Sequence, residues 1–368
     1  MNGIRVLALT TYPDHAAATR FRVVQYAPLL AEHGVRLDVR PFLSNRAFAT
    51  FYDRRRLAGT VAGIAAGMAR RVADLAHLGR YDVAFVQREA APVGPPVVEW
   101  LAQRRLPLVL DLDDPVYIER VSEIYGALAA AVKWSGKTTS LLQWATAVVC
   151  GNPAIAAHVE RFGKPATVLP TIVDVASFTP PASRASGEPV LGWIGSHSTL
   201  RYLRTLIPAL ERVARLHRFR VRIVGGGAEA ADVKIAGVEV EALPWVLERE
   251  IAHLQSFDLA VYPIVPDPWA EGKSGLKAIQ YLSCGVPYVA SPVGVVGQIG
   301  TPGRTHLEAT SDDEWVAALS RLLGDAEARE AMGREGRRWA VEHYSTRAAA
   351  ATLAGVLRGA ASKRNSRP

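Results

Sequence analysis

The sequence is poor in cysteine, with two in 368 residues, Cys150 and Cys284. Each cysteine ends an apolar run, and neither belongs to the paired spacing of a zinc site or a disulfide framework. We therefore expect both thiols to be small core residues of a protein from a reducing compartment.

Long apolar runs and a leader segment are also missing. The first strand candidate starts at Ile4, with no signal peptide ahead of it. The longest weakly polar run, Leu57 to Ala69, is bounded by arginines and is too short to span a bilayer. These absences predict a soluble, cytoplasmic protein, and they leave open a peripheral contact with the inner face of the membrane.

The charge balance is basic, with a net charge of +8 and a pI of about 9.6. This excess fits phosphate-bearing ligands, anionic membrane or nucleic acid, without choosing among them. The basic residues are not interleaved with aromatic ones and no nucleic-acid motif occurs, so nucleic acid is not an expected partner. The segment from Arg54 to Arg80 could lie on an anionic membrane as an amphipathic helix. An ordinary helix that covers a domain is the favoured interpretation.

Short apolar runs alternate with longer amphipathic ones along the whole chain, which predicts strands and helices in alternation around parallel sheets. The length is enough for two cores. The expected fold class is α/β, with two Rossmann-like, doubly wound domains that face each other across a cleft. Pro28 lies inside the first helical pattern, so that helix should kink or restart there. The expected strands are Ile4–Thr10, Leu37–Phe42, Asp82–Val86, Leu108–Asp111, Ala147–Cys150, Thr167–Leu169, Val190–Gly195, Arg220–Val224, Val238–Glu241, Leu259–Tyr262, Tyr288–Ala290 and His306–Glu308.

The clearest linker is the Pro/Ser-rich stretch TPPASRASGEP, residues 179–189. It separates a first domain, 1–178, from a second domain, 190–344. A C-terminal helix, 345–361, and a polar basic tail, 362–368, follow.

The segment WAEGKSGLKAIQYLSCGVPYVASP, Trp269 to Pro292, carries the strongest ligand signal. A glycine-rich turn leads into a helix start, where free backbone N–H groups and the helix dipole favour an anion. Lys277 lies in the first turn, and Gln280 follows one turn later on the same face. This arrangement suits a diphosphate with a hydroxylated ring beside it, as in a nucleotide sugar. The candidates here are Glu271, Lys273, Ser274, Gly275, Lys277 and Gln280.

Two further strand ends in the second half could contribute to the same phosphate site. GWIGSHSTLRYL leads from a strand into a helix start, although a plain N-cap is an equally good interpretation of Thr199. IVGGG permits a tight turn and close backbone approach. It lacks the full GxGxxG spacing and a ribose-binding acid, so it does not indicate a nicotinamide site. The candidates are Gly195, Ser196, His197, Ser198, Gly225 and Gly226.

In the first half, LDLDDP places carboxylates at the end of a buried strand, where they would be costly unless used or paired. Asp113 and Asp114 are expected to bind acceptor hydroxyls or to act as a catalytic base, and helix capping ahead of Pro115 is an equal alternative. No histidine lies nearby to complete a metal site. The segment TTYPDHAAATRFR supplies acceptor-side candidates: Tyr12, His15, Arg20 and Arg22.

Taken together, these segments resemble the GT-B-fold glycosyltransferases, and the chain is similar to family 4 of the retaining nucleotide-sugar enzymes. The resemblance covers most of the length and rests on RFRVVQYAPLL, LDLDDP, GWIGSHSTLRYL, the run from Pro244 to Ile264, and EGKSGLKAIQYLSCGVPYVASPVG. The last segment is the most specific, because a lysine precedes an acid or amide by three residues, before a small-residue turn and GxP.

The resemblance implies a nucleoside-diphosphate sugar bound mainly by the second domain, an acceptor side on the first domain, and no metal. By position, Lys277 would bind the diphosphate, Gln280 would face the ribose and Glu271 would approach the donor sugar. The implied activity is sugar transfer with retention to a glycan, lipid-linked or small-molecule hydroxyl acceptor, in cell-surface polysaccharide or glycoconjugate synthesis. The C-terminal helix would cross back to the first domain.

Two departures from the family pattern keep other functions open. Many relatives have two glutamates separated by seven residues, whereas this chain has Glu271 and then Gln280, one position further apart. Many relatives also have a histidine roughly where LDLDDP falls, and this chain has aspartates there. The alternatives are a sugar-nucleotide epimerase on the same fold and a non-catalytic protein that binds a nucleotide or a glycan. A nicotinamide dehydrogenase ranks third.

Overall fold

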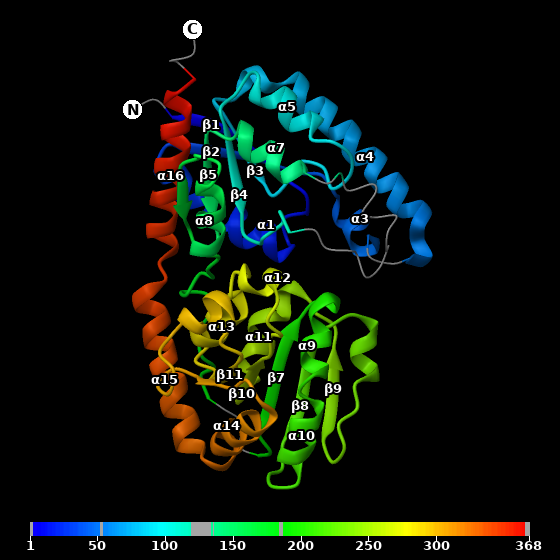
Figure 1. The fold of residues 1–368 in the computed structure, drawn as a ribbon, viewed down its shortest axis with the longest axis vertical. Helices are drawn as coiled ribbons and strands as arrows, with labels where there is room; N and C mark the ends of the chain where they lie inside the picture. Colours follow the sequence, from blue (N-terminus) through cyan, green and yellow to red (C-terminus); the bar gives the residue numbers. More distant parts are fainter. Residues whose placement is uncertain (1–2, 52–53, 119–133, 135, 184–186, 365–368) are drawn as a thin grey trace. The chain divides into compact units, whose positions relative to one another are not determined.

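Two compact α/β units make up the protein in a computed structural model, which describes residues 3–51, 54–118, 134, 136–183 and 187–364 (Figure 1). Unit 1 comprises residues 1–171 together with 346–368, and unit 2 comprises residues 172–345. Each unit contains a six-stranded parallel sheet, ordered β2-β1-β3-β4-β5-β6 in unit 1 and β12-β11-β10-β7-β8-β9 in unit 2. The expected fold class of two Rossmann-like domains is confirmed, whereas the cleft stays a prediction.

The strands of unit 1 match the expected ones with small shifts at their ends. β3 and β4 are buried along their whole length, because helices cover both faces of the sheet, and they therefore read as continuous apolar runs. The strands are β1 Ile4–Thr10, β2 Val35–Pro41, β3 Val83–Gln87, β4 Leu108–Leu112, β5 Ala147–Cys150 and β6 Ala166–Val168. The α-helices are α1 Ala17–Arg22, α2 Ala27–Glu32, α3 Asn45–Thr50, α4 Leu57–Ala76, α5 Val97–Gln103, α7 Lys137–Trp144, α8 Pro153–Glu160 and α16 Thr346–Ser362.

The first helical pattern is interrupted next to Pro28, as predicted. α1 ends at Arg22, a 3-10 turn spans Val24–Tyr26, and α2 starts at Ala27 with Pro28 in its first turn. Proline lacks a backbone N–H and has a fixed φ, so it is tolerated at a helix start but not inside a helix.

The strands of unit 2 also lie where the sequence places them. They are β7 Val190–Gly195, β8 Arg220–Gly225, β9 Glu239–Leu243, β10 Leu259–Tyr262, β11 Tyr288–Ala290 and β12 Leu307–Glu308. The α-helices are α9 Leu200–Arg204, α10 Ile207–Ala214, α11 Glu250–Gln255, α12 Pro268–Glu271, α13 Leu276–Ser283, α14 Asp312–Gly324 and α15 Ala326–His343.

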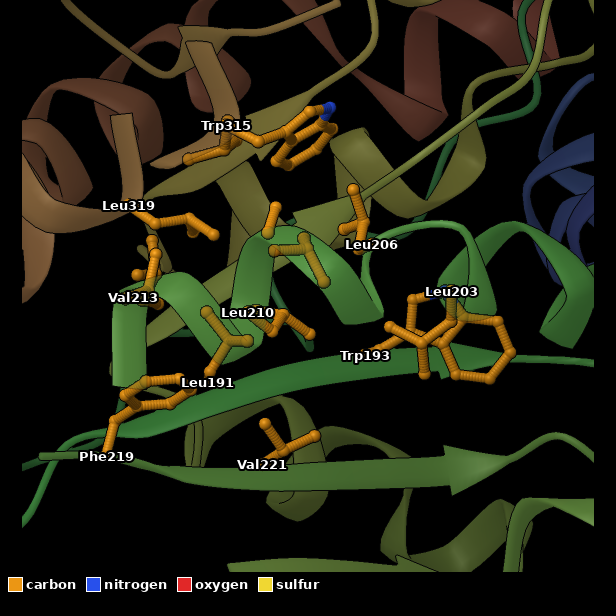
Figure 2. Packing of buried hydrophobic residues seen from close by; sticks show 14 of the residues in the cluster. Leu191, Trp193, Leu203, Leu206, Leu210, Val213, Phe219, Val221, Trp315 and Leu319 are labelled. Carbon is orange, nitrogen blue, oxygen red and sulfur yellow. The ribbon is translucent and has the colours of Figure 1, made fainter. Parts of the chain in front are cut away.

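Buried side chains pack against both faces of β7 in the core of unit 2. Figure 2 shows Leu191 of β7 beside Leu210 of α10, and Trp193 of β7 beside Leu203 of α9, and all of these side chains are buried. On the opposite face Gly192 leaves room for Phe257, because a Cβ atom on Gly192 would lie 2.0 Å from the Phe257 ring. Burying each large apolar side chain stabilises the fold by about 1.5–3 kcal/mol, so the end of β7 is firmly placed.

The boundary between the units lies earlier than the expected one at residue 178. Arg337 Nη1 donates 2.8 Å hydrogen bonds to the carbonyl oxygens of Phe178 and Ser283. Gln255 Nε2 donates to the Thr179 carbonyl oxygen at 2.8 Å. Because these bonds hold the chain to α11, α13 and α15, residues 172–178 belong to unit 2, together with most of the expected linker. Residues 184–186 of that linker lie outside the described residues.

The last helix, α16, belongs to unit 1 and packs against α2 and against the sheet from β1 to β5. Its buried residues are small or branched, including Ala350, Leu353 and Leu357. The predicted range for this helix was 345–361. Of the predicted tail, residues 365–368 lie outside the described part of the chain.

Candidate functional site

Glycines bring two strand ends of unit 2 into close approach. Gly195 of β7 pairs with Gly225 of β8, and Gly226 N donates to the Gly195 carbonyl oxygen at 2.8 Å. A Cβ atom on Gly225 would lie 2.2 Å from that oxygen, and both Gly225 and Gly226 have positive φ values of 83° and 77°. Only glycine meets both demands, so these predicted residues shape the backbone at the carboxyl edge of the sheet.

The polar turn after β7 presents hydroxyl groups at the same edge. Ser196 N donates to Thr199 Oγ1 at 3.2 Å, and the Thr199 hydroxyl donates back to the Ser196 carbonyl oxygen at 3.0 Å. Ser196 Oγ and Ser198 Oγ are 3.0 Å apart. Ser196 and His197 are exposed, and Ser198 is half-buried. Ser196 and Thr199 therefore form a capping box at this turn, and the side chains of Ser196, His197 and Ser198 are accessible to a ligand.

Lys277 enters this edge from the first turn of α13. Its Nζ lies 3.5 Å from Thr199 Oγ1, 4.7 Å from the ring centroid of Trp193 and 5.2 Å from that of Tyr262. Burial, together with the charge of Lys273, lowers the pKa of Lys277 to about 7. Across the described residues, Lys277 makes no ion pair with a carboxylate. Its cationic form therefore gains more than an ordinary surface lysine would when an anion binds nearby.

The loop ahead of α13 depends on another left-handed glycine. Gly275 is the N-cap of α13 with φ 67°, and a Cβ atom there would lie 2.3 Å from Ile299 Cδ1. Lys273 and Ser274 are half-buried in this loop, and Glu271 is exposed at the end of α12. The segment that the sequence singled out is therefore one continuous loop and helix start beside β7.

Gln280 lies deeper than its predicted role beside a ribose suggests, with 4% of its surface exposed. Its Nε2 donates to Glu250 Oε1 at 3.3 Å, and Trp245 Nε1 donates to the same oxygen at 3.2 Å. Glu250 is 3% exposed. The sequence reasoning missed Glu250 and Trp245, although an acid in the run after β9, at the start of an apolar helix, was a readable signal.

In unit 1, Asp113 and Asp114 follow β4 and share one arginine, Arg88, at the end of β3. Arg88 donates to both carboxylate oxygens of Asp113, at 2.6 and 2.8 Å, and to Asp114 Oδ2 at 2.6 Å. Arg88 also has an uncommon positive φ of 59°. The sequence reasoning missed this residue, because only the fold brings it to the aspartates.

The pKa of Asp113 reflects this pairing. Burial raises the pKa of its carboxyl, but the charge and hydrogen bonds of Arg88 more than offset burial and hold the pKa below its usual value. A carboxylate with both oxygens engaged and a low pKa does not suit a general base, which is one of the two roles predicted for Asp113. The other role, binding of acceptor hydroxyls, stays a prediction. Asp114 is more exposed, at 23% of its side chain.

Arg22, predicted on the acceptor side, lies in a buried ion pair of unit 1. Arg22 is 1% exposed, and its guanidinium pairs with Asp111 of β4 through two nitrogens. Its Nη1 also donates to the Leu169 carbonyl oxygen at 2.5 Å and to Thr171 Oγ1 at 3.4 Å. The buried guanidinium makes these contacts inside unit 1, so it is not accessible to an anionic acceptor.

The other acceptor-side candidates lie near the end of β1 and are half-buried. The rings of Tyr12 and His15 both contact Phe48, with centroid distances of 5.3 and 5.6 Å. The Arg20 guanidinium lies 4.2 Å from the ring centroid of Phe21. The structure therefore places Tyr12 and His15 together, on the same edge of the sheet as Asp113 and Asp114.

Part of the chain is similar to glycosyltransferases in comparisons with known proteins. Residues 188–325 match the family model described as glycosyl transferases group 1. The chain is 30% identical to a GDP-mannose-dependent alpha-(1-6)-phosphatidylinositol monomannoside mannosyltransferase of Mycolicibacterium smegmatis, over 54% of this chain and 58% of that one. It is also 30% identical to a D-inositol 3-phosphate glycosyltransferase of Arthrobacter sp., over 58% and 56%. The chain thus spans little more than half the length of these two relatives.

Solved structures share the fold over nearly the whole chain. A sucrose-phosphate synthase from Thermosynechococcus elongatus has a TM-score of 0.68 at 16% identity, covering 96% of this chain and 98% of that one. Anabaena Alr3699/HepE in complex with UDP-glucose has a TM-score of 0.66 at 13% identity, covering 97% and 100%. WaaG, a glycosyltransferase involved in lipopolysaccharide biosynthesis, has a TM-score of 0.64 at 15% identity, covering 97% and 100%. At such identities the likeness concerns the fold.

Proposed function

Because the chain has a GT-B fold and resembles the group 1 glycosyltransferases over residues 188–325, we propose that it transfers a sugar from a nucleoside-diphosphate sugar to a hydroxyl acceptor. The observation that carries the proposal is Lys277, a lysine with a pKa of about 7 beside the hydroxyl of Thr199 and the start of α13. A diphosphate at this helix start would receive the charge of Lys277 and the backbone N–H groups of the turn.

In the proposed mechanism, unit 2 stabilises the leaving group. When the bond between sugar and diphosphate breaks, negative charge builds on the diphosphate oxygens. Lys277, with Lys273 nearby, and the hydroxyl groups of Ser196 and Ser198 would offset this charge from fixed positions. Such preorganised electrostatic stabilisation is commonly the largest single contribution to catalysis.

Unit 1 would bind the acceptor in this proposal. Asp114 keeps a partly exposed carboxylate, and Tyr12 and His15 lie at the same edge of the sheet. Retention of configuration and a role in cell-surface polysaccharide or glycoconjugate synthesis are part of the proposal, supported by the family resemblance alone. The expectation that no metal takes part stays a prediction.

A ligand panel tests the proposal directly. Thermal unfolding would be measured with UDP, GDP, UDP-glucose, GDP-mannose and NADH, and a ligand present at 100 times its Kd should stabilise the protein by about 2.7 kcal/mol. The expected result is stabilisation by at least one nucleoside diphosphate and its sugar. Stabilisation by NADH alone, or by no ligand of the panel, would contradict the proposal.

A second assay separates the alternatives that share the fold. The bound nucleotide sugar is incubated with and without polyol, sugar and glycolipid acceptors, and the products are separated. A transferase gives nucleoside diphosphate and a glycosylated acceptor. Isomerised nucleotide sugar without acceptor would indicate an epimerase, and binding without any turnover would indicate a non-catalytic relative.

The exposed face of α4 supports peripheral contact with an anionic membrane as a further part of the proposal. Arg70 and Arg71 are turned inward, where Arg70 donates to the Phe42 carbonyl oxygen and Arg71 to those of Ala90 and Thr10. Arg55 and Arg56, just before the helix, are exposed. Every exposed residue of α4 itself is uncharged: Leu57, Ala58, Gly59, Val61, Ala62, Ala65, Ala66, Met68, Ala69, Val72, Ala73 and Ala76.

An uncharged helix face with arginines at one end fits the interface of an anionic bilayer. The test is co-sedimentation with vesicles of phosphatidylglycerol and phosphatidylcholine. Wild-type protein should bind the anionic vesicles, Val61→Asp/Met68→Asp should not, and Leu216→Asp on unit 2 should bind like wild type. Equal binding by all three proteins would refute this contact.

Two further features of the described residues concern the membrane and the thiols. None of the helices in the described ranges combines the length and the apolar character needed to cross a bilayer. Cys150 and Cys284 are both buried free thiols. The cytoplasmic side of the membrane remains the proposed location, since nucleotide sugars are made there.

A further inference from the structure

A buried carboxylate next to the proposed donor site has no role in the function as stated so far. Glu250 begins α11 and is 3% exposed. One of its oxygens, Oε1, accepts hydrogen bonds from Trp245 Nε1 at 3.2 Å and from Gln280 Nε2 at 3.3 Å. Both of these donors are neutral groups on different elements, so Glu250 links the segment after β9 to α13.

The bond to Glu250 determines which way the Gln280 amide faces. An amide side chain can be turned by 180°, which exchanges its NH2 group and its carbonyl oxygen at almost the same positions. An ionised carboxylate accepts hydrogen bonds but donates none. Glu250 therefore selects the orientation in which the NH2 group faces Glu250 and the carbonyl oxygen faces away from it.

The carbonyl oxygen of Gln280 is then an acceptor beside Lys277. Residues 277 and 280 are neighbours on one face of α13, because side chains three apart in a helix lie one above the other. A diphosphate held by Lys277 would bring the adjoining ribose to the level of Gln280. Ribose hydroxyls donate hydrogen bonds, and a fixed carbonyl oxygen accepts them.

We propose that Glu250 is a positioning residue, which fixes Gln280 so that its carbonyl oxygen accepts a hydrogen bond from a ribose hydroxyl of the donor nucleotide. This inference rests on the proposed function. It also explains why an amide suits position 280 better than a second acid. A second carboxylate 3.3 Å from Glu250 would be repelled in a buried place, whereas the pair as built carries one negative charge and one neutral acceptor.

A swap of the two side chains tests the inference. Glu250→Gln leaves the Gln280 amide without a fixed orientation, and Gln280→Glu places two carboxylates in contact. The double variant Glu250→Gln/Gln280→Glu restores one acid and one amide in exchanged positions. Glu241→Gln serves as the matched control. It removes from β9 a carboxylate that is paired with Arg222 of β8.

The readout is a ratio of two affinities. The first is the affinity for UDP or GDP, whichever binds the wild-type protein more tightly. The second is the affinity for inorganic pyrophosphate, which has no ribose. Glu250→Gln should lower this ratio by about 3- to 10-fold, the usual worth of one hydrogen bond. Gln280→Glu should lower it more at pH 8 than at pH 6, because paired carboxylates tolerate one another only when they share a proton. The swap should restore the ratio to within about twofold, and Glu241→Gln should leave it unchanged.

Three results would overturn the inference. One is an unchanged ratio in Glu250→Gln, and another is an equal loss of affinity for nucleotide and pyrophosphate, which would mark a purely structural role. The third is a double variant that has the wild-type free energy of unfolding without ligand but still shows the lowered ratio of nucleotide to pyrophosphate affinity. If wild-type protein bound neither UDP nor GDP, the proposed function itself would fail, whereas the three results above require that it binds one of them.

Discussion

The carboxyl edges of the two sheets differ in the surroundings of their cationic side chains. In unit 1, Arg22 pairs with Asp111, and Arg88 pairs with Asp113 and Asp114. In unit 2, Lys277 lies against a hydroxyl and two aromatic rings, and burial lowers its pKa to about 7. Among the described residues, the same fold thus holds arginines paired with aspartates in one unit and Lys277, which makes no ion pair with a carboxylate, in the other.

This difference separates charged side chains that stabilise the fold through ion pairs from a charged side chain that we propose binds a ligand. A buried ion pair stabilises its surroundings only while both partners are present. A desolvated cation without a partner costs stability until an anion arrives. Removing a basic residue should therefore have opposite effects on the stability of the two units.

The largest expected effect follows from breaking the pair in unit 1. Arg22→Ala would leave the Asp111 carboxylate buried and unpaired, which should lower the free energy of unfolding by about 3–5 kcal/mol. Chemical denaturation measures this loss. The control is Arg212→Ala, which removes an exposed ion pair with Asp313 and should cost at most about 1 kcal/mol. Similar losses in the two variants would mean that the buried pair has no special importance.

The opposite sign is expected in unit 2. Lys277→Met keeps the apolar stem and removes the desolvated charge, so it should leave the stability unchanged or raise it. Turnover of the nucleotide sugar should fall at least tenfold, which corresponds to about 1.4 kcal/mol of lost transition-state stabilisation. The exposed Lys234→Met provides the control for both measurements. Wild-type turnover in Lys277→Met would remove the main support for the proposed function.

The pH dependence sharpens the same contrast. A lysine whose pKa is lowered in the folded state disfavours folding below its usual pKa, and this penalty is complete below about pH 7. An anion raises the pKa again, so binding should take up a proton. Wild-type affinity for a nucleotide sugar should fall above pH 7 by up to about tenfold per pH unit.

Nucleotide sugars suit this measurement because their diphosphate group does not titrate between pH 6 and 9. Calorimetry in buffers with different ionisation enthalpies would count the proton taken up. Lys277→Met should show neither the pH dependence nor the proton uptake. A flat profile for the wild-type protein would show that Lys277 is not near the bound diphosphate.

The smallest effect concerns Asp114, the partly exposed member of the cluster in unit 1. Asp114→Asn should leave the affinity for the nucleotide sugar unchanged and lower kcat/KM for the acceptor by about 2- to 10-fold, as for one lost hydrogen bond. Initial rates at varied acceptor concentration measure this change. If instead donor affinity fell, Asp114 would not belong to an acceptor side.

Much of the fold was readable from the sequence because its signals are local. β7, β10 and β11 were predicted with their observed ends, since buried parallel strands read as apolar runs bounded by polar or glycine-rich turns. The same holds for the loop around Gly275 and for the lysine in the first turn of α13. The family pattern lies in these same local segments.

The side-chain pairs could not be read because they join distant parts of the chain. Arg22 reaches Asp111 across 89 positions, and Gln280 reaches Glu250 across 30. A cation near either end of a helix looks the same in the sequence whether it meets a ligand or a buried aspartate. The predicted unit boundary differs from the observed one for a related reason. The hydrogen bonds from Arg337 that hold residues 172–178 to unit 2 cannot be inferred from the composition of the linker.

The return of α16 to unit 1 has a consequence for biosynthesis. Unit 2 is one continuous stretch, 172–345, but unit 1 lacks a covering helix until residues 346–362 have been made. During translation unit 1 is begun before unit 2 but completed after it, and the patch that receives Leu353 and Leu357 stays uncovered until α16 has left the ribosome. A nonsense codon just ahead of α16 would therefore damage unit 1, which was made first, more than unit 2, which lies next to the lesion.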